Sequence, residues 1–156
     1  MRSPDVIQTN EGVDGWIKKL PELKQTMDFF FTETVEKPER EFQQLVVREN
    51  NYGRVSNDTD YFIVDCEYSH PTLANGKTDL VAFKWLSQSQ ARKRGEVRLA
   101  FIELKYGDGA LAGGSGLVEH VKHMRAIVQD QKALKDTEDE MKKVFAQKRK
   151  LGHVRR

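Results

Sequence analysis

Residues 97–106 read Val97-Arg98-Leu99-Ala100-Phe101-Ile102-Glu103-Leu104-Lys105-Tyr106, an apolar run that ends in an acid and a lysine two positions apart. Its β-branched and aromatic residues and its length are typical of a β-strand. Side chains two apart on a strand share a face, so we expect Glu103 and Lys105 on the same side as Phe101. An apolar strand is therefore predicted to carry two charged side chains on one face.

A second apolar run precedes it and reads Thr78-Asp79-Leu80-Val81-Ala82-Phe83-Lys84-Trp85. The turn-like residues 88–95 separate the two runs. If the runs pair as an antiparallel hairpin, the start of the first lies beside the end of the second. Asp79 is therefore predicted to lie next to Glu103 and Lys105.

Such a trio has a specific chemistry. Two carboxylates are hard oxygen ligands that suit Mg²⁺ or Mn²⁺, and an ion held in this way also accepts water and phosphate oxygens. The ion lowers the pKa of bound water and neutralises charge in a phosphoryl transition state. A neighbouring lysine can orient or deprotonate that water, or hold the phosphate. Asp79 and Glu103 as metal ligands, with Lys105 beside them, indicate phosphodiester hydrolysis.

An acid-x-lysine triplet also occurs by chance, and on an exposed strand it would be a solvated ion pair of little consequence. Here the apolar run before Glu103 favours a site, because charges that enter such a strand need partners or a metal.

These residues resemble the signature of the PD-(D/E)xK nuclease superfamily, an acid at one strand start and an acid-x-lysine triplet on the next strand. Asp79, Glu103 and Lys105 match the signature, while Thr78 stands where it has proline. The resemblance covers roughly residues 36–128. It implies an α/β fold with a restriction-endonuclease-like αβββα core, in which helices flank a mixed sheet, and a metal-dependent nuclease that acts on DNA.

The superfamily often adds a glutamate from a preceding helix, and Glu39-Arg40-Glu41-Phe42 resembles the opening of that helix in resolvases. Glu39 is the expected match because it shares the apolar face of Phe42 and Val46. Glu49 shares this face too, and Glu67 lies on the strand that follows the helix. The third acid stays open among Glu39, Glu49 and Glu67.

Residues 61–68 are predicted to form the first strand, with Asp65 and Glu67 together on one face in a supporting or surface role. Cys66 alternates with Phe62 and Val64, which predicts a small core residue. As the single cysteine it cannot form an internal disulfide, which indicates a reducing intracellular setting.

Two helices are expected to cover the core. The first begins at Pro38, runs to about Glu49 and has Phe42, Leu45 and Val46 as its inward stripe. The second follows a glycine-rich loop, residues 107–116, which lacks the lysine-hydroxyl ending of a P-loop and is expected to rim the active site. For this helix, the predicted cap is Ser115 and the predicted stripe is Leu117, Val118, Val121, Met124 and Val128.

His120 and His123 lie three apart on that second helix. A zinc site would need further ligands, so both are interpreted as polar or phosphate-facing residues. Farther on, Thr137-Glu138-Asp139-Glu140 resembles a capping box and predicts a last helix with apolar contacts from Met141, Val144 and Phe145. Residues 129–140 are too polar for a core position, and no fourth core strand is evident between Lys132 and Arg156.

The 156 residues predict a single nuclease-like domain, with a covering helical segment at 1–35, a core at 36–128 and a charged helix or tail at 129–156. The formal net charge is +2, and basic residues gather at 92–94 and at the C-terminus. These patches could attract a phosphate backbone, although a basic chain end is more often a solvated face.

The partners that the sequence predicts follow from these features. No apolar run approaches the length of a membrane span, which favours a cytoplasmic protein without a membrane partner. Nucleic acid is the expected partner, and the chain could also form a homodimer or belong to a larger protein. The alternative to a nuclease is a non-catalytic module with a nuclease-like fold that binds nucleic acid or a protein.

Overall fold

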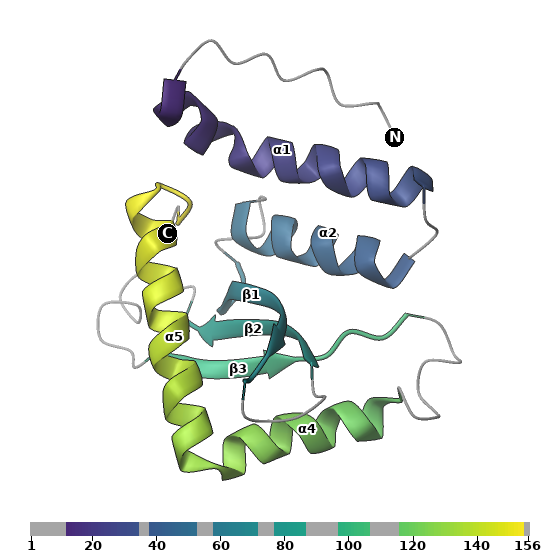
Figure 1. The fold of residues 1–156 in the computed structure, drawn as a ribbon, viewed down its shortest axis with the longest axis vertical. Coiled ribbons are helices and arrows are strands. Elements are labelled where there is room, and N and C mark those ends of the chain that lie inside the picture. Colours follow the sequence, from purple (N-terminus) through teal and green to yellow (C-terminus); the bar gives the residue numbers. More distant parts are fainter. Residues whose placement is uncertain are drawn as a thin grey trace.

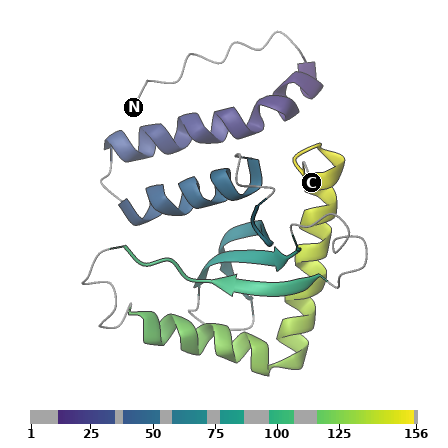
Figure 2. The same ribbon diagram turned by 180° about the vertical axis from the view of Figure 1, so that it is seen from behind.

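A computed structural model describes residues 12–34, 38–52, 58–71, 77–86, 97–106 and 116–154. The described elements follow in the order α1 (Gly12–Thr34), α2 (Pro38–Tyr52), β1 (Tyr61–Ser69), β2 (Lys77–Lys84), β3 (Arg98–Ile102), α4 (Leu117–Gln129) and α5 (Gln131–Lys150). Figures 1 and 2 show a sheet flanked by helices, with α2 on one side and α4 and α5 on the other. The fold is therefore α/β.

The sheet has the order β1-β2-β3, and both pairs of strands are antiparallel. The predicted hairpin between β2 and β3 is confirmed, with Leu80 paired to Ile102 and Lys84 paired to Arg98. The described strands thus form an antiparallel sheet where a mixed one was expected. A parallel strand needs a crossover, and the described chain beyond residue 116 continues as α4 and α5.

A β-bulge interrupts β1 at Val64, because the pairing with β2 shifts between Ile63 and Asp65. One extra residue inverts the alternation beyond it. Phe62 and Val64 lie in the core cluster beneath α5, whereas Cys66 packs with Ile63 against α2. The prediction that Cys66 shares a face with Phe62 and Val64 was therefore wrong. Glu67, with a φ of 53°, interrupts the alternation again.

The face of the sheet beneath α5 is apolar and aromatic. Met141 is fully buried there, and the Phe145 ring meets Phe62 and Phe83 edge-on, with centroids 5.1 and 5.7 Å apart. Edge-to-face aromatic pairs add to the free energy of burial. The predicted apolar contacts of this helix are confirmed, because Met141 belongs to this core cluster and Val144 and Phe145 pack against it.

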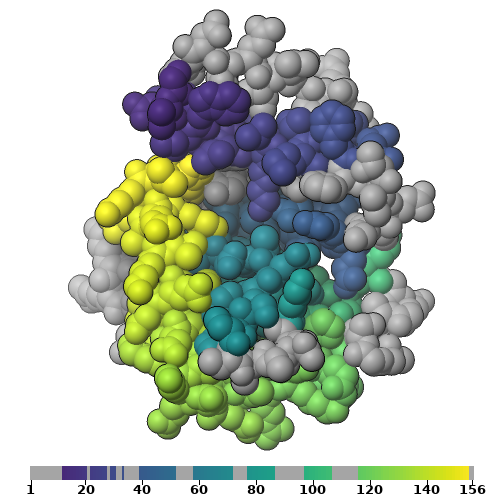
Figure 3. All heavy atoms as spheres, viewed as in Figure 1, coloured from purple at the N-terminus to yellow at the C-terminus, as the bar shows by residue number. Residues whose placement is uncertain are grey.

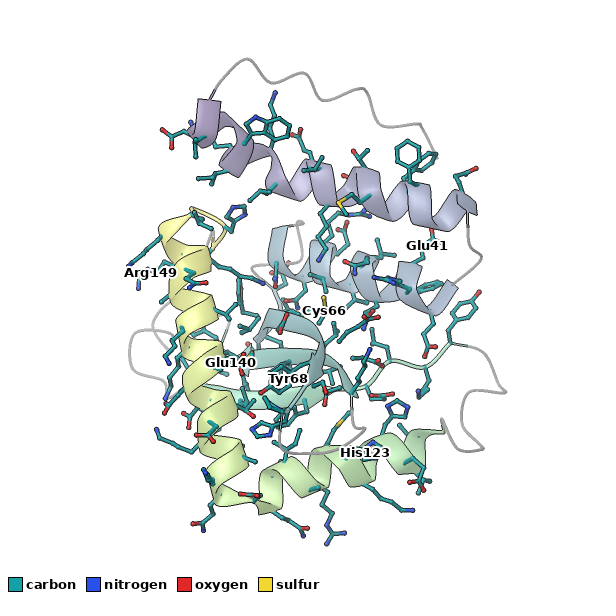
Figure 4. All side chains as sticks on the ribbon, viewed as in Figure 1. Glu41, Cys66, Tyr68, His123, Glu140 and Arg149 are labelled. Atoms are coloured by element: carbon teal, nitrogen blue, oxygen red, sulfur yellow. The ribbon has the colours of Figure 1, made fainter. Side chains whose placement is uncertain are left out.

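Helix α5 starts earlier than the predicted capping box. Asp130 is its N-cap and accepts hydrogen bonds from the backbone N–H groups of Lys132 and Ala133. Thr137 thus lies within the helix and not at its start. Its side chain is fully buried, and its hydroxyl donates to the Ala133 carbonyl at 2.8 Å. The Tyr68 hydroxyl lies 3.2 Å from that of Thr137 and donates to Glu140, toward which it points in Figure 4. Residues 129–140 are thus not too polar for a core position.

Helix α2 covers the opposite face, where Val46 is the one residue of the predicted stripe that packs against the sheet. Val47 packs against the sheet together with the buried amides of Gln43 and Asn51, while Phe42 and Leu45 are exposed. Asn51 donates to the Ile63 carbonyl at 2.7 Å and accepts from the Ile63 N–H at 3.0 Å. Amides can face the sheet here because strand backbone groups satisfy them, which an apolar pattern does not detect.

Helix α4 also differs from its prediction. Ile127 is its buried residue, whereas most of the predicted stripe is exposed, namely Leu117, Val118, Val121 and Val128. Gly116 is the N-cap, and Ser115 lies outside the described residues. Ile127 is thus the described residue through which α4 is buried, and fewer of its apolar residues are covered than the sequence predicted.

Helix α1 packs on α2, whereas the sequence predicted a segment that covers the sheet. The space-filling view shows α1 and α5 bordering a surface where strand residues drawn in teal are visible (Figure 3). None of the described helices is both long and apolar enough to cross a lipid bilayer.

Candidate functional site

The candidate site lies where the β2–β3 hairpin begins and ends. Because Leu80 pairs with Ile102, the next positions outward on the two strands are Asp79 and Glu103. The segment after β3, residues 103–106, then passes between the first turns of α2 and α4 (Figures 1 and 2). Two strands and two helices therefore meet at this point.

Asp79 is held by two hydrogen bonds from different elements. Its carboxylate Oδ2 accepts from the backbone N–H of Leu104 at 2.8 Å. Its carbonyl accepts from Gln43 Nε2 of α2 at 3.0 Å. These bonds restrain the carboxylate beside the acid-x-lysine triplet, as the predicted hairpin requires.

Glu103 is the most buried charged group of the site, with a side chain that is 5% exposed. Its Oε1 lies 2.8 Å from Lys105 Nζ and 2.8 Å from His120 Nδ1. Its Oε2 is also buried and has no hydrogen-bond partner among the described residues. A buried carboxylate oxygen without a partner carries a desolvation cost that a bound cation would offset.

The environment shifts the pKa values of both charged groups in the triplet. Burial raises the pKa of Glu103, and the Asp79 carboxylate adds to this, against the opposing pull of Lys105 and His120. Burial works to lower the pKa of Lys105, but the hydrogen bond and negative charge of Glu103 outweigh it, so that pKa is raised. Lys105 is therefore a stable cation at neutral pH.

Among the three candidate glutamates, Glu39 is the one that the structure brings to Lys105. Glu39 Oε1 lies 3.8 Å from Lys105 Nζ, and its side chain is 51% exposed. Glu49 lies ten residues farther along α2, about 15 Å at the rise of a helix, and contacts Arg48. Glu67 is exposed on β1.

His120 is a site residue whose contact the sequence did not reveal. It is the fourth residue of α4 and lies against Glu103, while the centroid of the His123 ring is 6.5 Å from that of His120. The two histidines lie only three residues apart on the same helix, so the sequence alone does not tell which of them meets Glu103. Only the packing of α4 against the sheet distinguishes them, and sequence spacing does not encode that packing.

The donor set fits a hard divalent cation in part. Among the described residues, no three His, Cys, Asp or Glu side chains gather as a metal-binding group. Two carboxylates do adjoin, from Asp79 and Glu103, and one buried oxygen of Glu103 lacks a partner. Mg²⁺ is commonly held by one or two carboxylates and completes its shell with water and substrate phosphate.

Comparisons with known proteins identify no relative of this chain. No family model matches the chain, and neither a curated protein nor a solved structure does. The expected glycine-rich rim at 107–116 lies outside the described residues except for Gly116.

Proposed function

We propose that this chain is a metal-dependent nuclease that hydrolyses phosphodiester bonds of nucleic acid, with DNA as the expected substrate. The observation that supports it most is the meeting of Asp79, Glu103 and Lys105 at one end of the hairpin. The order α2-β1-β2-β3-α4 agrees with the αβββα order of a restriction-endonuclease-like core, so the proposal extends to that fold.

In this proposal Asp79 and Glu103 hold Mg²⁺ or Mn²⁺. When bound, the ion supplies an activated water and neutralises charge on the phosphate. Lys105 serves as a cationic donor that orients the water or a phosphate oxygen, because its raised pKa disfavours a role as a base. Glu39 is half-exposed and restrains the Lys105 ammonium from the α2 side.

The backbone adds a favourable field for phosphate. Helices α2 and α4 both begin beside residues 103–106 (Figures 1 and 2). The amino-terminal end of a helix carries partial positive charge and free N–H groups, which attract anions. A phosphate at Lys105 would therefore lie near two such ends.

The test is cleavage of plasmid and single-stranded DNA with Mg²⁺ or Mn²⁺. We expect Asp79→Ala and Lys105→Ala each to lower the rate by about 10²–10³-fold, the usual cost of removing one charge-stabilising group. Asp65→Asn is the matched control, since Asp65 is also a partly buried strand aspartate whose carboxylate accepts a backbone N–H, that of Cys66. Wild-type rates in both site variants would overturn the proposal.

One observation favours the non-catalytic alternative. Lys105 and His120 already contact Glu103 at 2.8 Å, so the buried carboxylate has cationic or donor neighbours without a metal. In that case the site would be a structural ion pair in a module that binds nucleic acid. Calorimetric titration with Mn²⁺ separates the two functions, because retained DNA affinity without Mn²⁺ binding favours the module.

A further inference from the structure

Two aromatic rings lie stacked on the surface beside the candidate site. The centroids of Phe42 and Tyr106 are 4.9 Å apart and their planes differ by 29°. Each residue is nonetheless about half-exposed, Phe42 at 47% and Tyr106 at 49%. The pair is thus a broad aromatic surface that the protein leaves open to solvent.

The chain places this pair at the site from two distant segments. Tyr106 directly follows Lys105, and Phe42 lies three residues after Glu39, so about one helical turn separates them on α2. Glu39 and Lys105 approach each other at 3.8 Å, which brings both rings to the same rim. The tertiary fold therefore joins α2 to residues 103–106 through two neighbouring contacts, the Glu39–Lys105 ion pair and the Phe42–Tyr106 ring pair.

We propose that the Phe42–Tyr106 pair is a stacking platform for an unpaired nucleobase, next to the phosphate that Lys105 would hold. It rests on the proposed function for the position of the phosphate. An aromatic ring stacks on the face of any base and tolerates every sequence. In an intact duplex those faces are covered by neighbouring base pairs, so the substrate class is single-stranded or frayed nucleic acid.

A nucleobase fits this surface better than an apolar protein segment, because Lys105 next to the rings, which is paired with Glu103 and Glu39, is also the positive charge that the phosphate attached to the base would meet. The site also combines half-exposed aromatic rings with the Lys105 ammonium, which is 14% exposed. Removal of one stacking ring typically weakens single-strand binding by about tenfold or somewhat more. Binding of an intact duplex should not change.

The experiment measures binding of a fluorescent single strand and of a hairpin duplex without any divalent metal, so that no cleavage occurs. We expect Phe42→Ala and Tyr106→Leu to weaken single-strand binding about tenfold, while Tyr106→Phe retains it. Tyr61→Ala is the control, because Tyr61 is 37% exposed and pairs with Lys84 at the opposite end of the sheet. Circular dichroism verifies that each variant is folded.

A second readout reports stacking itself. In a strand that contains 2-aminopurine, wild-type protein should quench the base fluorescence, and Tyr106→Leu should relieve that quenching. Wild-type single-strand affinity in Tyr106→Leu would overturn the platform, and so would an equal loss of duplex affinity or no binding of either oligonucleotide. The cleavage assay decides the nuclease separately: a platform without cleavage leaves a binding module, whereas cleavage with unaltered binding in the ring variants refutes the platform alone.

Discussion

Buried side chains lie both beneath α5 and at the end of the same sheet around Glu103, yet the two regions are built from opposite kinds of side chain. Beneath α5, Phe62 and Met141 are fully buried among aromatic rings. Around Glu103, a carboxylate with 5% exposure touches Lys105 and His120 and keeps one oxygen without a described partner. Apolar burial stabilises the first region, whereas desolvated charge costs stability in the second.

This difference supports our proposal that the end of the sheet around Glu103 is the functional site, while the face beneath α5 stabilises the fold. A buried charge with a shifted pKa, at the point where several elements end, is a common property of functional sites. Such sites often give up stability for activity. Substitutions should therefore affect activity at one end of the sheet and stability beneath α5.

The largest effect is expected at Glu103. Glu103→Gln retains the shape but removes the charge, so cleavage should fall by about 10³-fold while the protein stays folded at neutral pH. A cleavage assay combined with thermal melting measures both quantities. Retained cleavage would show that the buried carboxylate is not part of the reaction.

A substitution beneath α5 should do the reverse. Met141→Ala removes a fully buried side chain, and the free energy of unfolding should fall by about 3 kcal/mol. Urea denaturation measures this loss. The affinity for Mn²⁺ under native conditions should not change, and a change would mean that the two regions are coupled.

A smaller loss is expected for the polar contact within the α5 face. Tyr68→Phe removes a hydroxyl that lies 3.1 Å from Glu140 Oε2 and 3.2 Å from Thr137 Oγ1. Loss of such a bond costs about 1 kcal/mol. Tyr61→Phe, at an exposed position, should change stability by less than about 0.5 kcal/mol in the same denaturation experiment. Equal effects would argue against the buried hydrogen bond.

The smallest effect is a pH dependence in metal-free protein. Folding raises the pKa of Glu103 above its ordinary 4.5, chiefly through burial. The protonated group therefore stabilises the fold at acidic pH, and this contribution disappears as pH rises through the raised pKa. Relative to the wild type, Glu103→Gln should gain stability as the pH rises from the ordinary pKa of Glu103 through its raised value. A constant difference in melting temperature would contradict the raised pKa.

The hairpin that carries the site could be predicted because two simple rules define it. Side chains alternate along strands, and antiparallel pairing brings the start of β2 to the end of β3. Asp79 and Glu103 are therefore neighbours whatever else the chain does. A position of Glu39 near the site was also expected, since it needs only α2 to pack over that end, but its contact with Lys105 was not predicted.

The helix faces could not be predicted from apolar periodicity alone. Gln43 and Asn51 turn inward because the backbone of β2 and β1 offers hydrogen bonds. Thr137 is buried because its hydroxyl finds Ala133 and Tyr68. In each case a hydrogen-bonding group from another part of the fold allows a polar residue to be buried, and apolar periodicity does not reveal that group.

Calorimetric titration of Mn²⁺ tests most directly our proposal that Asp79 and Glu103 together form a site for a divalent cation. The wild type and the Asp65→Asn control should bind Mn²⁺ with equal affinity, while Asp79→Asn should bind at least about tenfold more weakly. Absence of Mn²⁺ binding by the wild type, or equal binding by Asp79→Asn, would contradict the claim.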